Sequence, residues 1–292
     1  MLQKTTQPGS GMSAAVVELS LAHSPDSDDA FMFYALATKK VPTGNLVFSH
    51  VLEDIETLNH RAQKEVYDIT AVSFHAYADL ADRYILMSCG ASFGDGYGPI
   101  VVTRASLVGE KLKGKRVAIP GKKTTACLAL RLYESDIETV EARFDEILDK
   151  VVKGEADAGV VIHEGQLTYG SYGLAKMVDL GAWWRNETGL PLPLGGNVIR
   201  RALDPETIRR ADSLLRSSIA YGLEHRDEAL EYALHFARGL EPATAEHFVS
   251  MYVNEWTLDY GEKGRRAVQT LLDRGHKAGI IPHAIKAEFV GQ

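Results

Sequence analysis

Apolar runs and stretches of helical spacing alternate along the first third of the chain. β-Branched and apolar residues dominate 16–22, 46–52 and 69–73, and each run has the length and composition of a strand. Between these runs, 30–40 and 55–66 carry apolar residues at helical spacing. Strands that alternate with helices predict an α/β fold with a largely parallel sheet.

A second alternating set begins after a glycine-rich stretch that ends at Pro99. From Asp204 onward the pattern is helical, with Asp204 suited to cap a helix and Pro205 suited to its first position. Four helices are expected in this last part. Between the glycine-rich stretch and Asp204, the spacing predicts helices at 124–135 and 144–155 and strands at 100–102, 115–121, 137–143 and 156–163.

Two crossings rich in glycine or proline, near 98–103 and 191–199, separate these sets. They predict two lobes joined by two strands, with a ligand cleft between them. The first, larger lobe would combine 13–100 with 198–292, and the second would comprise 101–197.

Composition narrows the class of protein. Of the 292 residues, 45% are hydrophobic and 24% charged, which is typical of a globular protein with a real core. A net charge of −7 argues against a nucleic-acid partner. No apolar run approaches the roughly 18 residues that span a bilayer, so no membrane partner is expected. Cys89 and Cys127 match no metal or redox spacing.

The first residues lack the continuous apolar core of a secretion signal, because Glu18 interrupts the apolar run. We therefore expect a cytoplasmic protein, with residues 1–12 forming a flexible leader. The sequence leaves open whether the protein is a monomer or a homodimer.

Ligands of open α/β sheets bind beyond the carboxyl ends of the strands. Four such strand ends are candidates: 23–29, 71–75, 120–126 and 163–165. At the third, two lysines and two threonines precede a helix whose free backbone amides and dipole favour an anion. Plain capping by Thr124 or Thr125 is the alternative. A nucleotide-binding P-loop fits poorly, because Arg116 stands where Ser or Thr is needed and a strand follows.

Two further strand ends offer polar side chains. Ser73 can cap the next helix or present its hydroxyl to a ligand. His163 directly follows a strand of buried character, where a histidine can act as a base near neutral pH; a structural histidine is the alternative. Leu167 stands where a zinc HExxH motif needs its second histidine, so no metal site is expected.

The segment 24–36, SPDSDDAFMFYAL, gathers three aspartates ahead of an apolar helix. Asp28 and Asp29 are placed to cap a helix that begins at Ala30. Carboxylates facing the cleft would instead accept hydrogen bonds from ligand hydroxyl groups and repel an anion. We therefore expect a ligand with its anionic end near Thr125 and its hydroxylated end at the first lobe.

Several stretches from about Leu19 to the last helices are characteristic when taken together. The most specific ones are GVVIHEGQLTYGSYGL and VDLGAWWRNETGLPLPLGGN, and SPDSDDAFMFYAL, IPGKKTTA and YVNEWTLDYGEKG accompany them. Together they resemble the 1,4-dihydroxy-6-naphthoate synthase family of the futalosine route to menaquinone. That family often has Pro-Asn-Asp where this chain has Ser-Asp-Asp at 27–29, so only Asp29 is kept.

The resemblance implies a two-lobed fold of the type II periplasmic-binding-protein kind, with two mixed sheets flanked by helices. It implies a lyase that converts cyclic dehypoxanthinyl futalosine to 1,4-dihydroxy-6-naphthoate and releases a three-carbon fragment, without a cofactor. His163 matches the family's general base. The substrate-contacting positions fall on Ala71, Val72, Ser73, Thr125 and Ala126, with Asn59 as a further cleft residue.

Two rival functions share this fold. A non-catalytic small-molecule binding protein would use the same lobes, but it should carry a secretion signal. A chorismate dehydratase-like enzyme of the same pathway is the other rival, and the IHE and GAWW stretches count against it.

Overall fold

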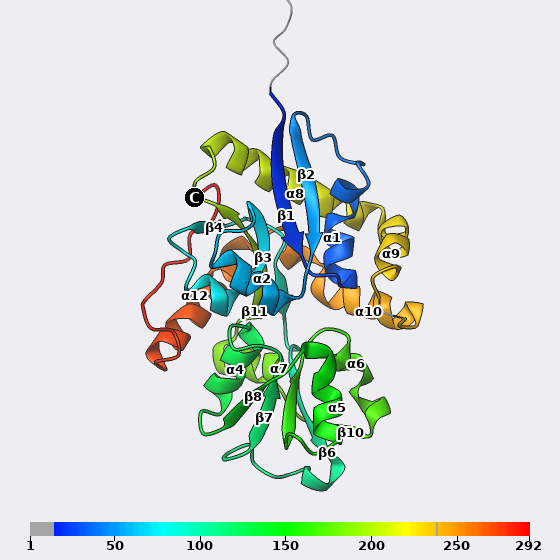
Figure 1. Cartoon of the computed structure of the whole chain (residues 1–292), viewed down its shortest axis with the longest axis vertical. Coiled ribbons are helices and arrows are strands. Elements are labelled where there is room, and N and C mark those ends of the chain that lie inside the picture. Colours follow the sequence, from blue (N-terminus) through cyan, green and yellow to red (C-terminus); the bar gives the residue numbers. More distant parts are fainter. Residues whose placement is uncertain (1–14, 238) are drawn as a thin grey trace, which may run out of the picture.

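The computed structural model describes residues 15–237 and 239–292, and these residues form two separate β-sheets. Figure 1 shows the two sheets in two halves that are stacked along the longest axis of the molecule. The leader expected at residues 1–12 lies outside the described residues.

The first sheet has six strands and lies in the half that contains both ends of the described chain. Parallel pairing joins β1 to β2 and β3, whereas β11 runs antiparallel to its neighbours. All five residues of β3 are buried, as expected for a central strand. In spatial order the strands are β2 (Leu46–Leu52), β1 (Val17–His23), β3 (Ile69–Ser73), β11 (Leu192–Arg200) and β4 (Tyr84–Leu86), with β5 (Ser92–Gly94) also paired to β11.

The second sheet has five strands and is also mixed. β7 pairs in parallel with β8 and β9, but β6 is antiparallel to β9 and β10. The prediction of largely parallel sheets is therefore only partly right, because β6 and β11, at the two crossings, run against their neighbours. The spatial order is β10 (Leu174–Asp179), β6 (Ile100–Arg104), β9 (Ala158–Val161), β7 (Arg116–Ile119) and β8 (Glu138–Glu141).

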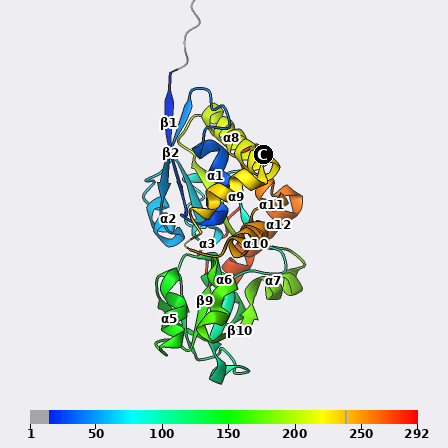
Figure 2. The ribbon, with the colours of Figure 1, turned by 90° about the vertical axis from the view of Figure 1, so that its right-hand side faces the viewer.

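Helices flank both sheets. In the side view of Figure 2, the helices from α8 to α12 lie on one side of β1 and β2, and α2 lies on the other. The first half contains α1 (Ser27–Ala37), α2 (Ile55–Ala62), α3 (Phe74–Tyr77), α8 (Pro205–Glu224), α9 (Arg226–Leu234), α10 (Pro242–Tyr252), α11 (Glu255–Leu258) and α12 (Gly261–Lys277). The second half contains α4 (Thr125–Tyr133), α5 (Ile147–Val152), α6 (Gly165–Thr168), α7 (Leu180–Thr188) and the short 3₁₀ turns Ala105–Leu107, Phe144–Glu146 and Tyr169–Tyr172.

The local sequence explains the long C-terminal helices. Asp204 caps α8 by accepting hydrogen bonds from the amides of Glu206 and Thr207, and Pro205 opens the helix, as predicted. The buried residues of α12 recur at helical spacing and form one apolar stripe: Gly264, Ala267, Val268, Leu271, Leu272 and Gly275.

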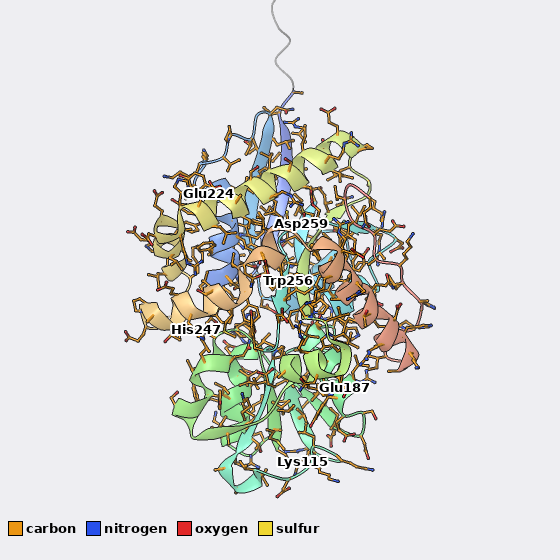
Figure 3. All side chains as sticks on the ribbon, turned by 180° about the vertical axis from the view of Figure 1, so that it is seen from behind. Lys115, Glu187, Glu224, His247, Trp256 and Asp259 are labelled. Carbon is orange, nitrogen blue, oxygen red and sulfur yellow. The ribbon has the colours of Figure 1, made fainter. Side chains whose placement is uncertain are left out.

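The two halves pack against each other. One hydrophobic cluster runs from Phe74 and Tyr260 in the first half to Leu128 and Trp184 in the second. Seen from behind in Figure 3, Trp256 and Asp259 lie in the first half and Lys115 in the second. The exact lobe borders stay a prediction, although β11 pairs within the first sheet from Leu192 onward.

Within the described part of the chain, no helix is long and apolar enough to cross a membrane.

Candidate functional site

A cavity of about 120 Å³ lies between the two halves, where all four candidate strand ends meet. The first half contributes the loop after β1 and the end of β3. The second half contributes the start of α4 and the turn after β9. Of the predicted site residues, Ala71, Val72, Ser73, Thr125, Ala126 and His163 line this cavity.

Asn59, the remaining predicted site residue, lies behind the cavity wall. Its side chain is fully buried, and its Oδ1 accepts a hydrogen bond from the backbone amide of Ser73 at 2.9 Å. Its Nδ2 donates to Ser73 Oγ at 3.2 Å and to Glu56 Oε2 at 3.0 Å. Asn59 therefore holds Ser73 in place and does not line the cavity.

The start of α4 faces the cavity with a capped first turn. Thr124 caps the helix, because its Oγ1 accepts a hydrogen bond from the amide of Cys127 at 3.2 Å. Thr125 Oγ1 accepts from the backbone amide of His75 at 3.3 Å, and this contact crosses between the halves. Burial, aided by Lys123, lowers the pKa of His75 to about 4, so its ring is neutral at pH 7.

His163 follows β9 and extends towards the first half. Its Nδ1 lies 3.0 Å from Oδ2 of the almost fully buried Asp26, and its ring meets Phe144 edge-on at a centroid distance of 4.9 Å. Among the described residues, its buried Nε2 has no hydrogen-bond partner. The backbone of His163 has a φ of 55°, a strained region for a residue with a side chain and one that recurs at functional sites.

The acidic loop differs from the prediction. Helix α1 begins at Ser27, not at Ala30, and its N-cap is Asp26, whose side chain makes no capping hydrogen bond. The prediction that Asp28 and Asp29 cap a helix beginning at Ala30 is therefore wrong, because both residues lie inside the first turn of α1. Instead, Asp29 folds back, and its Oδ2 accepts a hydrogen bond from the amide of Ser24 at 2.7 Å.

These acids are crowded and buried, which changes their protonation. Burial and the neighbouring carboxylates, first of all Asp29 and Asp26, raise the pKa of Asp28 well above its usual range. Burial and Asp26 raise the pKa of Asp29 to about 7. This shift favours the protonated form of Asp28, which has a hydroxyl to donate and a carbonyl to accept.

Sequence reasoning missed several polar residues of the cavity wall, among them Gln166, Asn197 and Tyr252. Tyr252 donates to Gln166 Oε1 at 2.8 Å, which ties α10 to α6 across the cleft. Asn197 donates to Gly90 O at 2.7 Å, while its buried Oδ1 lacks a hydrogen-bond partner among the described residues. Only tertiary packing brings them to the cavity, although Gln166 lies three residues after His163.

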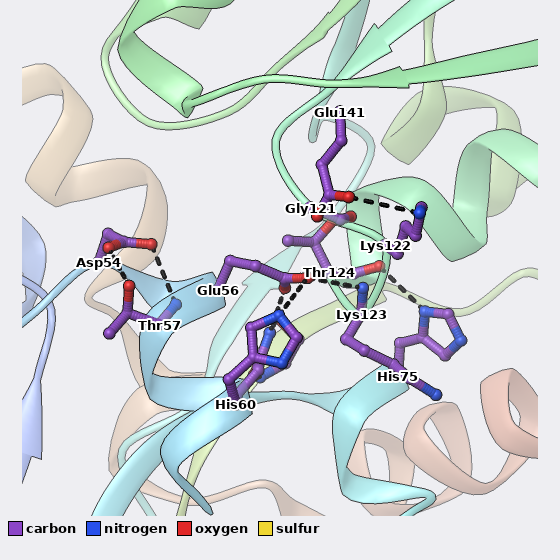
Figure 4. Close-up of polar contacts among 12 residues, drawn as sticks. Asp54, Glu56, Thr57, His60, His75, Gly121, Lys122, Lys123, Thr124 and Glu141 are labelled. Atoms are coloured by element: carbon purple, nitrogen blue, oxygen red, sulfur yellow. Dashed lines mark hydrogen bonds and ion pairs between the residues drawn. The ribbon is translucent and has the colours of Figure 1, made fainter.

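A second set of contacts crosses the cleft beside the cavity (Figure 4). Glu56 Oε1 accepts a hydrogen bond from the backbone amide of Lys123 at 3.2 Å, and Lys123 Nζ pairs with Asp79 at 2.5 Å. A Cβ at Gly121 would lie 2.3 Å from the carboxyl carbon of Glu56, so only glycine permits this approach. The loop before α4 is thus held by α2 and the segment after α3.

No group of three or more His, Cys, Asp or Glu side chains in residues 15–237 and 239–292 is arranged to hold a metal ion.

A family model for menaquinone biosynthesis matches residues 19–277. The chain belongs to this family.

Two relatives of this chain are named 1,4-dihydroxy-6-naphthoate synthases. The one from Thermus thermophilus is 43% identical over 272 residues, which cover 93% of this chain and 99% of the relative. The one from Streptomyces coelicolor is 36% identical over 270 residues, which cover 90% of this chain and 95% of the relative. The predicted family resemblance is confirmed.

Solved structures support the same fold for this menaquinone-biosynthesis family member. A protein from Archaeoglobus fulgidus is 48% identical with a TM-score of 0.86, and the match covers 90% of this chain and 98% of that one. The alkanesulfonate-binding protein of Xanthomonas axonopodis is 14% identical with a TM-score of 0.70, and the match covers 94% of this chain and 97% of that one. At that identity the likeness concerns the fold alone, and it confirms the predicted periplasmic-binding-protein-like architecture.

Proposed function

We propose that this chain is a 1,4-dihydroxy-6-naphthoate synthase, a lyase that converts cyclic dehypoxanthinyl futalosine to 1,4-dihydroxy-6-naphthoate for menaquinone. Relatives with that name match nearly the whole chain, and the cavity lies at the strand ends where the family resemblance places the substrate. The enzyme would act in the cytoplasm. It would be a monomer or a homodimer, and light scattering of the purified protein distinguishes these two oligomeric states.

The observation that carries the proposal is His163 on the cavity wall. Its Nε2 is buried and has no hydrogen-bond partner among the described residues, so a substrate C–H or O–H group can take that place. Aromatising a bicyclic substrate requires removal of a proton, and a positioned base contributes about 10²–10⁴-fold to such a step. His163 would be this general base, and the closed cleft would exclude water from the intermediates.

The cavity also suggests how the substrate lies. Its carboxylate would bind at the start of α4, near Thr125 and Ala126, where backbone amides and the helix dipole favour an anion. Its hydroxyl groups would face Asp28 and Asp29, which line the opposite wall. A soaked substrate analogue that places its carboxylate against those aspartates would reverse this orientation.

Turnover measurements test the function. The purified protein is incubated with cyclic dehypoxanthinyl futalosine or with chorismate, and the naphthoate product is followed by ultraviolet absorbance. We expect a product only from the first, and His163→Ala should lower kcat by about two to four decades. Calorimetric substrate affinity should change little. His247→Ala is the matched control, since His247 is exposed on α10 (Figure 3).

Retained turnover in His163→Ala would remove this residue from the mechanism. Loss of binding together with loss of stability would instead give His163 a purely structural role.

A further inference from the structure

One contact between the two halves, which the proposed mechanism does not use, joins His163 to Asp26. His163 follows β9 of the second sheet, and Asp26 lies in the loop after β1 of the first sheet. Their Nδ1 and Oδ2 atoms lie 3.0 Å apart, the separation of a charge-assisted hydrogen bond. The pair is therefore complete only while the two halves are in contact.

Asp26 is itself held in place. Only 1% of its surface is exposed, and Ser24 Oγ donates a hydrogen bond to the same Oδ2 that faces His163. Asp29, which accepts from the amide of Ser24, fixes the backbone of this loop. A buried carboxylate with a prearranged oxygen can orient an imidazole without reorganisation during the reaction.

The consequence concerns which ring nitrogen of His163 carries the proton. A carboxylate only accepts hydrogen bonds, so Nδ1 must be the donor, and the lone pair of the neutral ring is left on Nε2. Nε2 is the buried atom that lacks a partner among the described residues. When Nε2 takes a proton, the resulting imidazolium has its positive charge beside Asp26.

We propose that Asp26 is a positioning residue that completes the catalytic base from the opposite half, by fixing the Nδ1–H tautomer of His163 and stabilising its protonated form. The inference rests on the proposed function, in which His163 removes a substrate proton. It gives the first of the clustered aspartates a role separate from that of Asp28 and Asp29.

Asp26→Asn is the sharpest variant, because the side chains have nearly the same shape. Either the amide nitrogen of the introduced asparagine faces Nδ1 and forces the proton onto Nε2, or its oxygen faces Nδ1 without a charge. We expect kcat to fall by about 10²–10⁴-fold with KM changed less than about threefold, in line with an aspartate that orients a catalytic histidine. The double variant Asp26→Asn/His163→Ala should be no slower than His163→Ala alone, since Asp26 acts only through His163.

A spectroscopic readout separates orientation from structure. Nitrogen-15 NMR of the wild-type protein should show His163 protonated on Nδ1 in its neutral form. In Asp26→Asn, a larger share of the neutral ring should be protonated on Nε2, because the charged acceptor beside Nδ1 is gone. Asp204→Asn is the matched control, because Asp204 is an exposed carboxylate that caps α8 and does not line the cavity, and this variant should leave the tautomer unchanged.

The outcomes are distinguishable. If the wild-type protein forms no naphthoate, the proposed function fails. If the wild type is active and His163→Ala is inactive, but Asp26→Asn turns over at the wild-type rate, only the present inference fails. A wild-type His163 protonated on Nε2 overturns the inference even if Asp26→Asn does not fold.

Discussion

Asn59 Oδ1 accepts a hydrogen bond from the backbone amide of Ser73 at 2.9 Å, and this bond fixes the end of β3 against α2. Because the Asn59 side chain also donates to Glu56, one buried amide connects a cavity residue with a carboxylate that reaches the second half. The contact explains how a residue outside the cavity affects its shape.

Asn59→Ala should destabilise the protein, because it leaves the buried amide of Ser73 without an acceptor. Such an orphaned group costs about 1–3 kcal/mol in the free energy of unfolding, which urea denaturation measures. Ser73→Ala is the matched control: it removes the hydroxyl but keeps the backbone bond, so we expect a loss below about 1 kcal/mol. Equal losses in the two variants would show that the backbone bond contributes little.

A second prediction concerns the contact that Glu56 makes between the two halves. Its Oε1 accepts a hydrogen bond from the backbone amide of Lys123. Glu56→Ala should therefore shift the protein towards a more open arrangement of the halves and weaken substrate binding. A hydrogen bond to a charged group contributes about 1.5–3 kcal/mol, which corresponds to roughly a tenfold or greater increase in the substrate Kd. Calorimetry measures the affinity, and small-angle X-ray scattering should show an increased radius of gyration.

The neighbouring Lys122–Glu141 ion pair supplies the control. It lies at 3.5 Å between side chains that are 69% and 44% exposed, and exposed pairs contribute only about 0–1 kcal/mol. Glu141→Ala should therefore leave the affinity within a fewfold of wild type. If both variants behave alike, the Glu56 contact does not hold the cleft closed.

Much of the candidate site could be predicted from the sequence, because strand ends follow from local patterns. The order of strands and helices identified four loops, and the rule that ligands bind beyond the carboxyl ends of strands brought them together. His163, Ser73 and Thr125 were found in this way, and all three line the cavity.

The contacts across the cleft could not be predicted, because they depend on how the two halves dock. The pairing of His163 with Asp26 joins loops that lie far apart in the sequence, and no local pattern encodes it. The start of α1 was missed for a related reason. Apolar spacing begins at Ala30, but the backbone amide of Ala30 already donates a hydrogen bond to the carbonyl of Asp26, and the polar first turn of the helix is buried.

Asp29 should make stability depend on pH in an unusual direction. Its pKa is raised to about 7 in the folded protein, so between about pH 4, near the ordinary value, and pH 7 the folded state binds more protons than the unfolded state. Stability from this group is complete below the unfolded pKa and is lost as the pH rises towards 7. Relative to wild type, Asp29→Asn should therefore become more stable as the pH is raised through this range, as measured by urea denaturation.

Asp204 provides the contrast for this measurement. Hydrogen bonds from Thr207 lower its pKa, so its contribution changes only at lower pH, and Asp204→Asn should show a constant difference from wild type between about pH 4 and 7. A constant difference for Asp29→Asn as well would mean that Asp29 is ionised throughout this range.

His75 should have the opposite effect on stability. Burial and then Lys123 lower its pKa to about 4, against an ordinary value near 6.5. Between these values the unfolded state binds the proton and the folded state does not, so stability from this group falls as the pH falls from about 6.5 towards 4. The loss in the free energy of unfolding between pH 7 and 5 should be about 2 kcal/mol.

His75→Gln, which stays neutral, should remove that part of the pH dependence. His60→Gln is the control and should not remove it, because the His60 side chain is 59% exposed. Urea denaturation of the three proteins at pH 7 and 5 measures the difference. An unchanged slope in His75→Gln would show that the folded protein accepts a proton on His75 at no cost, and the neutral ring assigned to it beside Thr124 and Thr125 would be wrong.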